Sequence, residues 1–480
     1  MKKLLALLLV LAMALSMAAC APAPAAEAET PETETTKGVE GTTEAPTQAE
    51  NTNPDVEVVT YYCTIGAYLH VLIEEIDKWN ATTGAEKGVY IELTSNINDG
   101  NTAIEQQFTA GNYWDLMDGG YNATWVARGW VKDLEEVAAN NADVAALLDS
   151  YRQYMVPGLS LVSGITTALP LEVVPIKMAV NLDLFQKSGL ELPKTWDDVV
   201  AAAKKITEDN PGTAWGYGGT NWSVYYRRLH MKATMNSTEV GWWDPNTETY
   251  SFAQYEPVIK AVAQMYADGS ILGLDDLAID PIRAEFAAGK VGMFIAPAYD
   301  WSVYTNQFPA QCNFAFIDVP TFVEGDAPYK GVYLDRINMS ICAPLYDSAT
   351  DAHKKAVEEA WLFLNSDELN SIIYANGGII PYKPEIIANT ELLITENAEQ
   401  WAQMSDITNY TSMFVRPDTV LPLEGDTFEI NFSAIVHGEL EWTPELIADL
   451  EQRYNDAYAA AKEDPDVDCS NYAYAYDHSK

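Results

Sequence analysis

Aromatic side chains set among acids and amides are the residues of this sequence best suited to hold a small polar molecule. Trp222, Tyr225 and Tyr226 follow a Gly-rich stretch on a polar segment, and Trp242 precedes a run with alternating acids. An aromatic ring packs on a flat apolar face, such as the C–H face of a sugar, while carboxylates accept hydrogen bonds from hydroxyls. We therefore expect Trp222, Tyr225 and Trp242 to line a ligand site, with packing in a core as the alternative.

The acids after Trp242 raise the question of a metal. The run Asp244-Pro-Asn-Thr-Glu248 alternates acids like part of a calcium loop, but it lacks the glycine at the sixth place. A hairpin turn is the favoured interpretation. We expect no metal site and no cofactor.

A second group of candidates consists of residues that follow expected strands. In open α/β sheets the ligand binds beyond the carboxyl ends of the strands. The residues at such places are Thr64, Gly66, Asn98, Asp118 and Trp125. Because Asn98 also begins a good turn sequence, a turn is its equal alternative.

Motifs of the common enzyme classes are missing from the sequence. It contains no GxSxG, HExxH or CxxC, and its five histidines are widely scattered. A secreted polysaccharide hydrolase would need only two placed carboxylates, and the chain has 70 acids. Binding without turnover is the favoured interpretation, and such a hydrolase is the weaker alternative.

The elements that must position these residues alternate between strands and helices. Runs 56–62 and 89–93 predict buried strands, and the spacing of Leu69, Leu72, Ile73, Ile76 and Trp79 predicts one buried helix face. Thr195 and Asp198 form a capping box at the start of a later helix. Alternation of this kind indicates an α/β fold with largely parallel sheets.

The first twenty residues have the parts of an export signal. Lys2 and Lys3 precede an uncharged apolar stretch over residues 4–17, and two alanines then lead to Cys20. A stretch of this length is too short to span a bilayer comfortably. We expect residues 1–19 to be a signal peptide. The alternative is an ordinary signal that ends in a chance cysteine.

Residues 20–55 are expected to form a disordered acidic linker. Ala, Pro, Glu, Thr and Gly dominate this segment, and they cannot bury enough apolar surface to offset the entropy of ordering. The whole chain has a net charge of −42, which argues against nucleic acid as a partner. The remaining body of about 425 residues is long enough for two lobes.

Four cysteines lie in the body, at positions 63, 312, 342 and 469. Their wide spacing does not match a metal or redox site. In an exported protein they form disulfides or stay buried as free thiols, and the sequence leaves both open.

Four segments, in order, resemble the extracellular solute-binding proteins of ABC importers, in the family that includes maltose-binding protein. They are Ala110-Gly111-Asn-Tyr-Trp-Asp115 with Gly129-Trp-Val-Lys-Asp133-Leu134, Ala168-Leu169-Pro170 with Val180-Asn181-Leu-Asp183-Leu-Phe185-Gln-Lys-Ser-Gly189-Leu190, Phe286-Ala-Ala-Gly289-Lys-Val-Gly-Met293-Phe-Ile295, and Ala360-Trp361-Leu-Phe-Leu364 with Gly377-Gly378 and Pro381. The ending at Cys20 is similar to the lipobox of bacterial lipoproteins, which implies a lipid on Cys20.

This resemblance implies a two-lobe clamshell of the type II periplasmic-binding-protein class. Each lobe would be a mostly parallel sheet flanked by helices, and hinge crossings would join the two. We expect lobe 1 to comprise residues 56–172 plus 296–333, and lobe 2 residues 173–295 plus 334–480. The partners implied are ABC permease subunits and, through the lipid, the outer face of the bacterial cytoplasmic membrane. The protein is expected to act as a monomer.

The resemblance also adds site residues and a ligand class. It places Tyr299 and Trp301 at two family tryptophans, one of which stacks on sugar, with core packing as the alternative. Asp335 and Arg336 lie near the expected later crossing, where they would grip a ligand or pair with each other. The expected solute is an oligosaccharide. A peptide, a polyamine or another small solute is the alternative, and an adhesion or envelope-assembly lipoprotein without a small ligand is a further one.

Overall fold

A computed structural model divides the chain into two compact units, residues 1–34 and residues 35–480. The structure describes residues 48–64, 66, 68–96, 100–119, 123–220, 224–238, 240–274, 277–325, 329–465 and 467–478, with the backbone alone for 100–101 and 224–228. The expected signal peptide, Cys20, most of the linker, Asn98 and Trp222 lie outside these residues.

The first sheet has four strands in the order β14-β3-β1-β2. They are β1 (Glu57–Cys63), β2 (Val89–Ser95), β3 (Leu116–Met117) and β14 (Ser340–Ile341). Strand β1 lies parallel to both β2 and β3, so the carboxyl ends of these three strands lie at one edge of the sheet. The predicted strands at 56–62 and 89–93 are confirmed.

Helices packed on this sheet bury its apolar residues. Helix α2 (Leu69–Trp79) buries the face that its 3.6-residue spacing predicts. Helix α15 (Asp351–Leu364) comes from far along the chain and packs on β1 and β2, while α16 (Asp367–Ala375) packs on α2. The first sheet is therefore completed by residues after 340.

The second sheet has seven strands, in the order β10-β7-β11-β6-β13-β15, with β12 also paired to β6. These strands are β6 (Pro170–Asn181), β7 (Trp215–Gly218), β10 (Ile271–Leu272), β11 (Val291–Pro297), β12 (Phe314–Ile317), β13 (Gly331–Ile337) and β15 (Tyr410–Ser412). Strands β10, β7 and β11 are mutually parallel, and β6 runs antiparallel to β11.

Helices α8 (Leu182–Ser188), α9 (Trp196–Asp209), α11 (Glu256–Ala267) and α12 (Ile279–Ala287) flank this sheet. The capping box at the start of α9 is confirmed, since the Thr195 hydroxyl accepts from the Asp198 N–H and the Asp198 carboxylate accepts from the Thr195 N–H. The remaining helices of eight or more residues are α4 (Gly100–Thr109), α7 (Ala142–Tyr151), α10 (Val224–Ala233), α18 (Ala398–Ser405), α19 (Phe428–Val436) and α20 (Pro444–Glu463).

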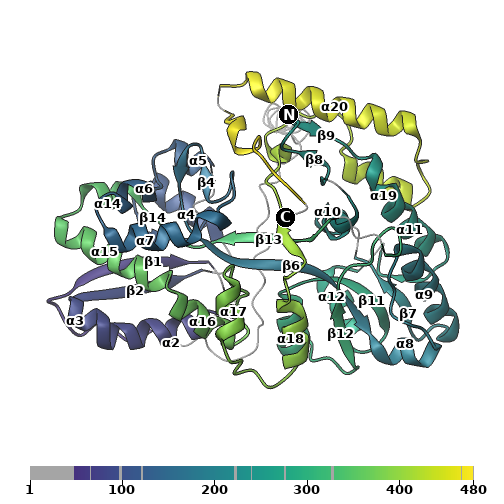
Figure 1. Ribbon diagram of the computed structural model, residues 1–480, viewed down its shortest axis with the longest axis horizontal. Coiled ribbons are helices and arrows are strands. Elements are labelled where there is room, and N and C mark those ends of the chain that lie inside the picture. The colour runs from purple at the N-terminus through teal and green to yellow at the C-terminus, as the bar shows by residue number, and fades with distance from the viewer. Residues whose placement is uncertain are drawn as a thin grey trace, which may run out of the picture. The chain divides into compact units, whose positions relative to one another are not determined.

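Strand β6 connects the two groups of elements, and all twelve of its residues are buried (Figure 1). Its first half pairs with β13 and its second half with β11 and β12. The expected lobe boundaries are wrong for two segments. Strand β12 pairs with β6 in the second sheet rather than joining the first, and residues 340–364 pack with the first sheet rather than the second.

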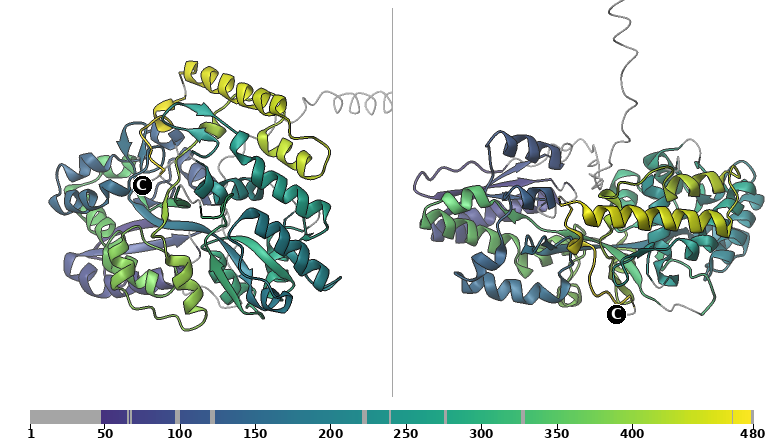
Figure 2. Two further views of the ribbon diagram at one scale, coloured as in Figure 1. Left: turned by 45° about the vertical axis from the view of Figure 1, so that its right-hand side comes forward. Right: turned by 90° about the horizontal axis from the view of Figure 1, so that it is seen from above.

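The last long helix, α20, packs on a short hairpin formed by β8 (Trp243–Asp244) and β9 (Thr249–Tyr250) (Figure 2). Within this hairpin the Asp244 carboxylate accepts from the Asn246 N–H at 2.9 Å and from the Thr247 hydroxyl at 2.7 Å. Glu248 pairs with Lys462 of α20 at 2.8 Å. The predicted hairpin turn is confirmed, because β8 and β9 pair as antiparallel strands on either side of it.

The four cysteines of the body are free thiols, with Cys63 and Cys342 buried. Burial raises the pKa of Cys342 to about 12 and that of Cys312 to about 11. Among the described residues, no helix combines the length and the apolar character needed to cross a bilayer.

Candidate functional site

Polar side chains gather where the carboxyl ends of β1 and β3 meet β6 and β13. Asp118, directly after β3, accepts hydrogen bonds from the Tyr61 hydroxyl at 2.8 Å and from the Thr64 N–H at 2.7 Å. The Thr64 hydroxyl donates to the same carboxylate at 3.2 Å. These contacts fix Asp118 and Thr64, two of the predicted residues, in one place.

Strands β6 and β13 add an ion pair to this cluster. The Arg336 guanidinium donates to the Glu172 carboxylate at 2.6 Å. The two residues lie directly opposite each other in the antiparallel ladder, so their side chains share one face. Glu172 is buried, whereas about a third of the Arg336 side chain (31%) is exposed, which leaves the guanidinium accessible to a ligand.

The electrostatics show that these groups interact. Burial raises the pKa of Asp118, while its hydrogen bonds to Thr64 and Tyr61 and the charge of Arg336 act in the opposite direction. Burial also raises the pKa of Glu172, and Arg336 opposes this. Tyr68 is buried beside the same groups, and burial together with the Cys63 thiol and both carboxylates raises its pKa well above the usual value.

Together, Tyr61, Thr64, Tyr68, Asp118, Glu172 and Arg336 form the strand-end cluster. Tyr61, Tyr68, Asp118 and Glu172 are buried, whereas Thr64 and Arg336 are half-buried and are the members with surface for a ligand that carries hydroxyl or carboxylate groups. Within the part of the chain that the structure describes, no three His, Cys, Asp or Glu side chains lie together as ligands for a metal ion.

Asp335 and Arg336 were expected either to grip a ligand or to pair with each other. The expected pairing between them is wrong. Consecutive residues of a strand point to opposite faces, so Asp335 faces away from Arg336. Its carboxylate accepts from the Tyr382 hydroxyl and, at 2.7 Å, from the Ser412 hydroxyl. Burial raises the pKa of Asp335 to about 7, although these hydrogen bonds act in the opposite direction.

Three of the predicted aromatic residues pack in the core. Trp125 is fully buried and donates to Glu105 at 2.8 Å, and Trp242 is buried under the Arg416 guanidinium, 4.0 Å from its ring centre. The Trp301 ring lies 4.9 Å from that of Trp401, and its N–H donates to the Asn397 carbonyl at 2.9 Å. These rings have no exposed face for a ligand, which corrects the prediction for all three.

The remaining candidates lie at strand ends or outside the described residues. Gly66 follows β1 and is half-buried, as is Tyr299, which follows β11 and has the Arg283 guanidinium 5.6 Å from its ring centre. Asn98 and Trp222 are not among the described residues, and only the backbone of Tyr225 is described, within α10.

Sequence reasoning missed Glu172, Tyr61 and Tyr68. A signal for Glu172 was present, because it is the one acid in an apolar run over residues 170–181. A buried carboxylate either pairs with a cation or has a raised pKa, so an acid in an apolar run marks a residue whose surroundings are unusual. Tyr61 lies in the predicted strand 56–62, but no local pattern shows that its hydroxyl reaches Asp118.

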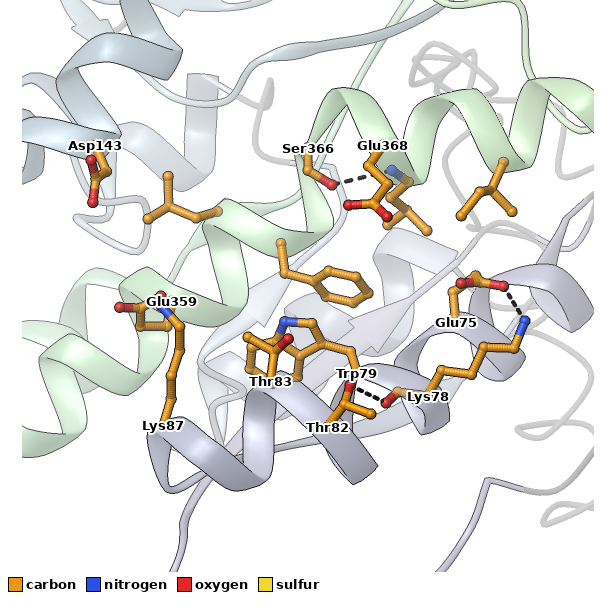
Figure 3. Close-up of a pocket in the computed structure, with 14 residues that line it drawn as sticks. Glu75, Lys78, Trp79, Thr82, Thr83, Lys87, Asp143, Glu359, Ser366 and Glu368 are labelled. Atoms are coloured by element: carbon orange, nitrogen blue, oxygen red, sulfur yellow. Dashed lines mark hydrogen bonds and ion pairs between the residues drawn. The ribbon is translucent and has the colours of Figure 1, made fainter. Parts of the chain in front are cut away.

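A pocket of about 500 Å³ lies elsewhere, on the outer helices of the first sheet (Figure 3). Trp79 and Phe363 stack at 5.1 Å inside it. At its rim Lys78 pairs with Glu75 at 2.6 Å, and Lys87 pairs with Glu359 at 2.5 Å. Since these charges neutralise each other and no strand ends there, we do not include this pocket in the candidate site.

Comparison with known proteins identifies a matching family and structures with a similar fold. The family model of the bacterial extracellular solute-binding proteins matches residues 65–365. The fold is similar to that of the ABC substrate-binding protein Lmo0181 from Listeria monocytogenes in complex with cycloalternan, with 16% identity, a TM-score of 0.58, and coverage of 84% of this chain and 100% of that chain.

Two further structures are similar over a comparable range. Apo RafE from Streptococcus pneumoniae is 14% identical with a TM-score of 0.61, covering 86% of this chain and 100% of that one. The maltose/maltodextrin-binding domain MalE from Bdellovibrio bacteriovorus, bound to maltotriose, is 15% identical with a TM-score of 0.59, covering 84% and 100%. These likenesses confirm the predicted two-lobe α/β fold. The family match extends over more than half of the chain, which therefore belongs to the bacterial extracellular solute-binding proteins.

Proposed function

We propose that this chain is the substrate-binding lipoprotein of an ABC importer and that it captures an oligosaccharide between its two lobes. The observation that carries the proposal is the strand-end cluster, because it joins residues of the first sheet with β6 and β13, the strands that connect the two sheets. A ligand that contacts both lobes gains affinity only in the closed state and so drives closure.

Two observations support an oligosaccharide as the ligand: the polar groups of the cluster and the ligands bound by proteins of similar fold. Hydroxyls of a sugar match the carboxylates and guanidinium of the cluster, and Tyr299 at the end of β11 offers an aromatic ring. Proteins of the same fold are in complex with cycloalternan and with maltotriose. Binding without turnover fits a family of binding proteins.

The location and partners follow from the sequence. We propose that a lipid on Cys20 holds the protein at the outer face of the cytoplasmic membrane and that the closed, loaded form docks on the permease. A tether raises the local concentration of the protein near that partner. Cys20→Ser should move the protein from the membrane fraction into the medium, and continued membrane association would contradict the anchor.

A thermal-shift screen of the purified protein against saccharides, peptides and polyamines tests the ligand class. A ligand at 100 times its dissociation constant adds about 2.7 kcal/mol of stability, which is easily detected as a higher Tm. We expect an oligosaccharide at micromolar concentration to raise the Tm. A response to peptides or amines alone would overturn the saccharide assignment while keeping solute capture.

A further inference from the structure

Strand β2 is an outer strand of the first sheet, with β1 on one side only (Figure 1). Within the described residues, the backbone N–H and C=O groups on its other side have no neighbouring strand. Such groups attract strands of other molecules unless something covers them.

Two side-chain amides cover this edge in place of a strand. Asn80, just after α2, accepts from the Ile91 N–H at 2.8 Å and donates to the Ile91 carbonyl at 3.0 Å. Gln48 donates to the same carbonyl at 2.6 Å and accepts from the Leu93 N–H at 2.8 Å. Asn80 belongs to the folded body, whereas Gln48 lies in the expected linker.

Ala49, the residue after Gln48, also forms hydrogen bonds with the folded body. The Ala49 N–H donates to both oxygens of Asp77 in α2, at 3.3 and 3.2 Å, and its carbonyl accepts from the Tyr90 hydroxyl. The side chains of Asn51 and Asn53 each accept from the N–H two residues on, at 2.9 and 3.0 Å, and so form turns that lead to β1.

We propose that residues 48–53 form a clasp that fixes the end of the linker to the edge of β2. In the anchored protein the tether would then leave from the edge of the first sheet and would pull on that lobe alone. This consequence rests on the proposed lipid anchor, whereas the clasp itself does not.

Holding the tether on one lobe leaves the other lobe free. If the tether instead began at β1 with a longer loose segment, the body would rotate more freely above the membrane. The clasp therefore presents the protein to a membrane partner in a narrower range of orientations, without restricting closure about β6 and β13.

Hydrogen exchange at individual amides of the acylated protein in lipid nanodiscs tests the clasp. In Gln48→Ala the Leu93 amide loses its acceptor and should exchange at least about tenfold faster, because local opening exposes it to water. The Ile91 amide should keep its protection, because its acceptor is Asn80. The converse variant, Asn80→Ala, should release Ile91 and spare Leu93.

The matched control is Glu50→Ala, which alters an exposed residue of the same segment and should change neither amide. Unchanged exchange at Leu93 in Gln48→Ala would overturn the proposal, as would equal acceleration at both amides, which indicates general loss of stability. Fractionation of Cys20→Ser reports on the anchor separately. If the anchor fails while Leu93 responds as expected, the clasp stands and only its role in orientation falls.

Discussion

At the scale of single residues, Arg336 contributes both to the stability of the fold and to the proposed binding of a ligand. Its guanidinium neutralises the buried Glu172, and it is still partly exposed beside Asp118. A planar guanidinium holds a carboxylate and a ligand at once through its fixed fork of donors. The exposed part of Arg336 is therefore the best single point at which to test ligand binding.

Arg336→Lys keeps the positive charge beside Glu172 but removes the fork. We expect the affinity for the solute to fall about tenfold or more, with a smaller loss of stability than full removal of the charge would cause. Isothermal titration calorimetry measures the affinity. Arg453→Lys, at a half-buried position of α20, is the matched control, and equal affinity in both variants would remove Arg336 from the site.

Trp301 serves stability rather than binding. A Cβ at Gly377 would lie 2.6 Å from its ring, which shows how closely the backbone packs against it. Trp301→Ala should lower the free energy of unfolding by about 3–5 kcal/mol, the usual cost of removing a buried aromatic side chain. Chemical denaturation measures this. Unchanged stability with lost solute binding would restore the ligand role predicted from the sequence.

Asp335 should make stability depend on pH. Its pKa is about 7 in the folded protein and about 3.9 in the unfolded chain, so the folded state holds the proton more tightly. The stability from this group is therefore complete below about pH 4 and is lost as the pH rises through 7. Asp335→Asn should flatten that part of the profile, as measured by denaturation at several pH values. An identical slope in both proteins would contradict this assignment.

At the scale of helices and strands, local patterns predicted most of what the structure shows. The buried face of α2, the strands β1 and β2 and the caps of α9 all depend on residues close together in the chain. The strand-end rule brought Thr64 and Asp118 into consideration, and the two are in contact because parallel strands end at a common edge. These predictions needed no knowledge of long-range contacts.

Predictions that depended on distant contacts were less successful. Arg336 forms an ion pair with Glu172, which lies 164 positions away in the sequence. No local sequence pattern predicts which residues of two distant strands lie opposite each other. The sheet to which β12 belongs was predicted wrongly for the same reason, since chain order does not fix strand neighbours. Trp125 was expected at a ligand from the strand-end rule, Trp242 from the acids that follow it and Trp301 from the family resemblance. None of these signals separates a ring that stacks on a ligand from one that is buried in the core.

The capping box of α9 provides a test at this scale. Thr195→Ala removes the acceptor for the Asp198 N–H, 3.1 Å away, and should lower the free energy of unfolding by about 1 kcal/mol. Solute affinity should not change, because α9 lies away from the strand-end cluster. Thr443→Ala, at the cap of α20, should cost a similar amount. If neither variant lowers the free energy of unfolding, the first turns of both helices are already frayed in solution.

At the scale of the whole molecule, strand β6 holds the two halves of the second sheet together, and its partner β13 leads directly to β14 of the first sheet. One continuous buried strand pairs with β13 at one end and with β11 and β12 at the other. Motion between the lobes must therefore occur by bending of β6 and β13 and the connections around them. We expect unfolding to be cooperative across both lobes.

The free thiols have a consequence for how the protein withstands its surroundings. An exported protein meets oxidants, yet no crosslink joins the described cysteines, and raised pKa values keep Cys312 and Cys342 as unreactive thiols. Differential scanning calorimetry should give the same Tm with and without dithiothreitol, and a lower Tm in the reductant would indicate a disulfide. We expect the stability of the described part of the chain to be the same in oxidising and in reducing surroundings, because packing rather than a disulfide holds it together.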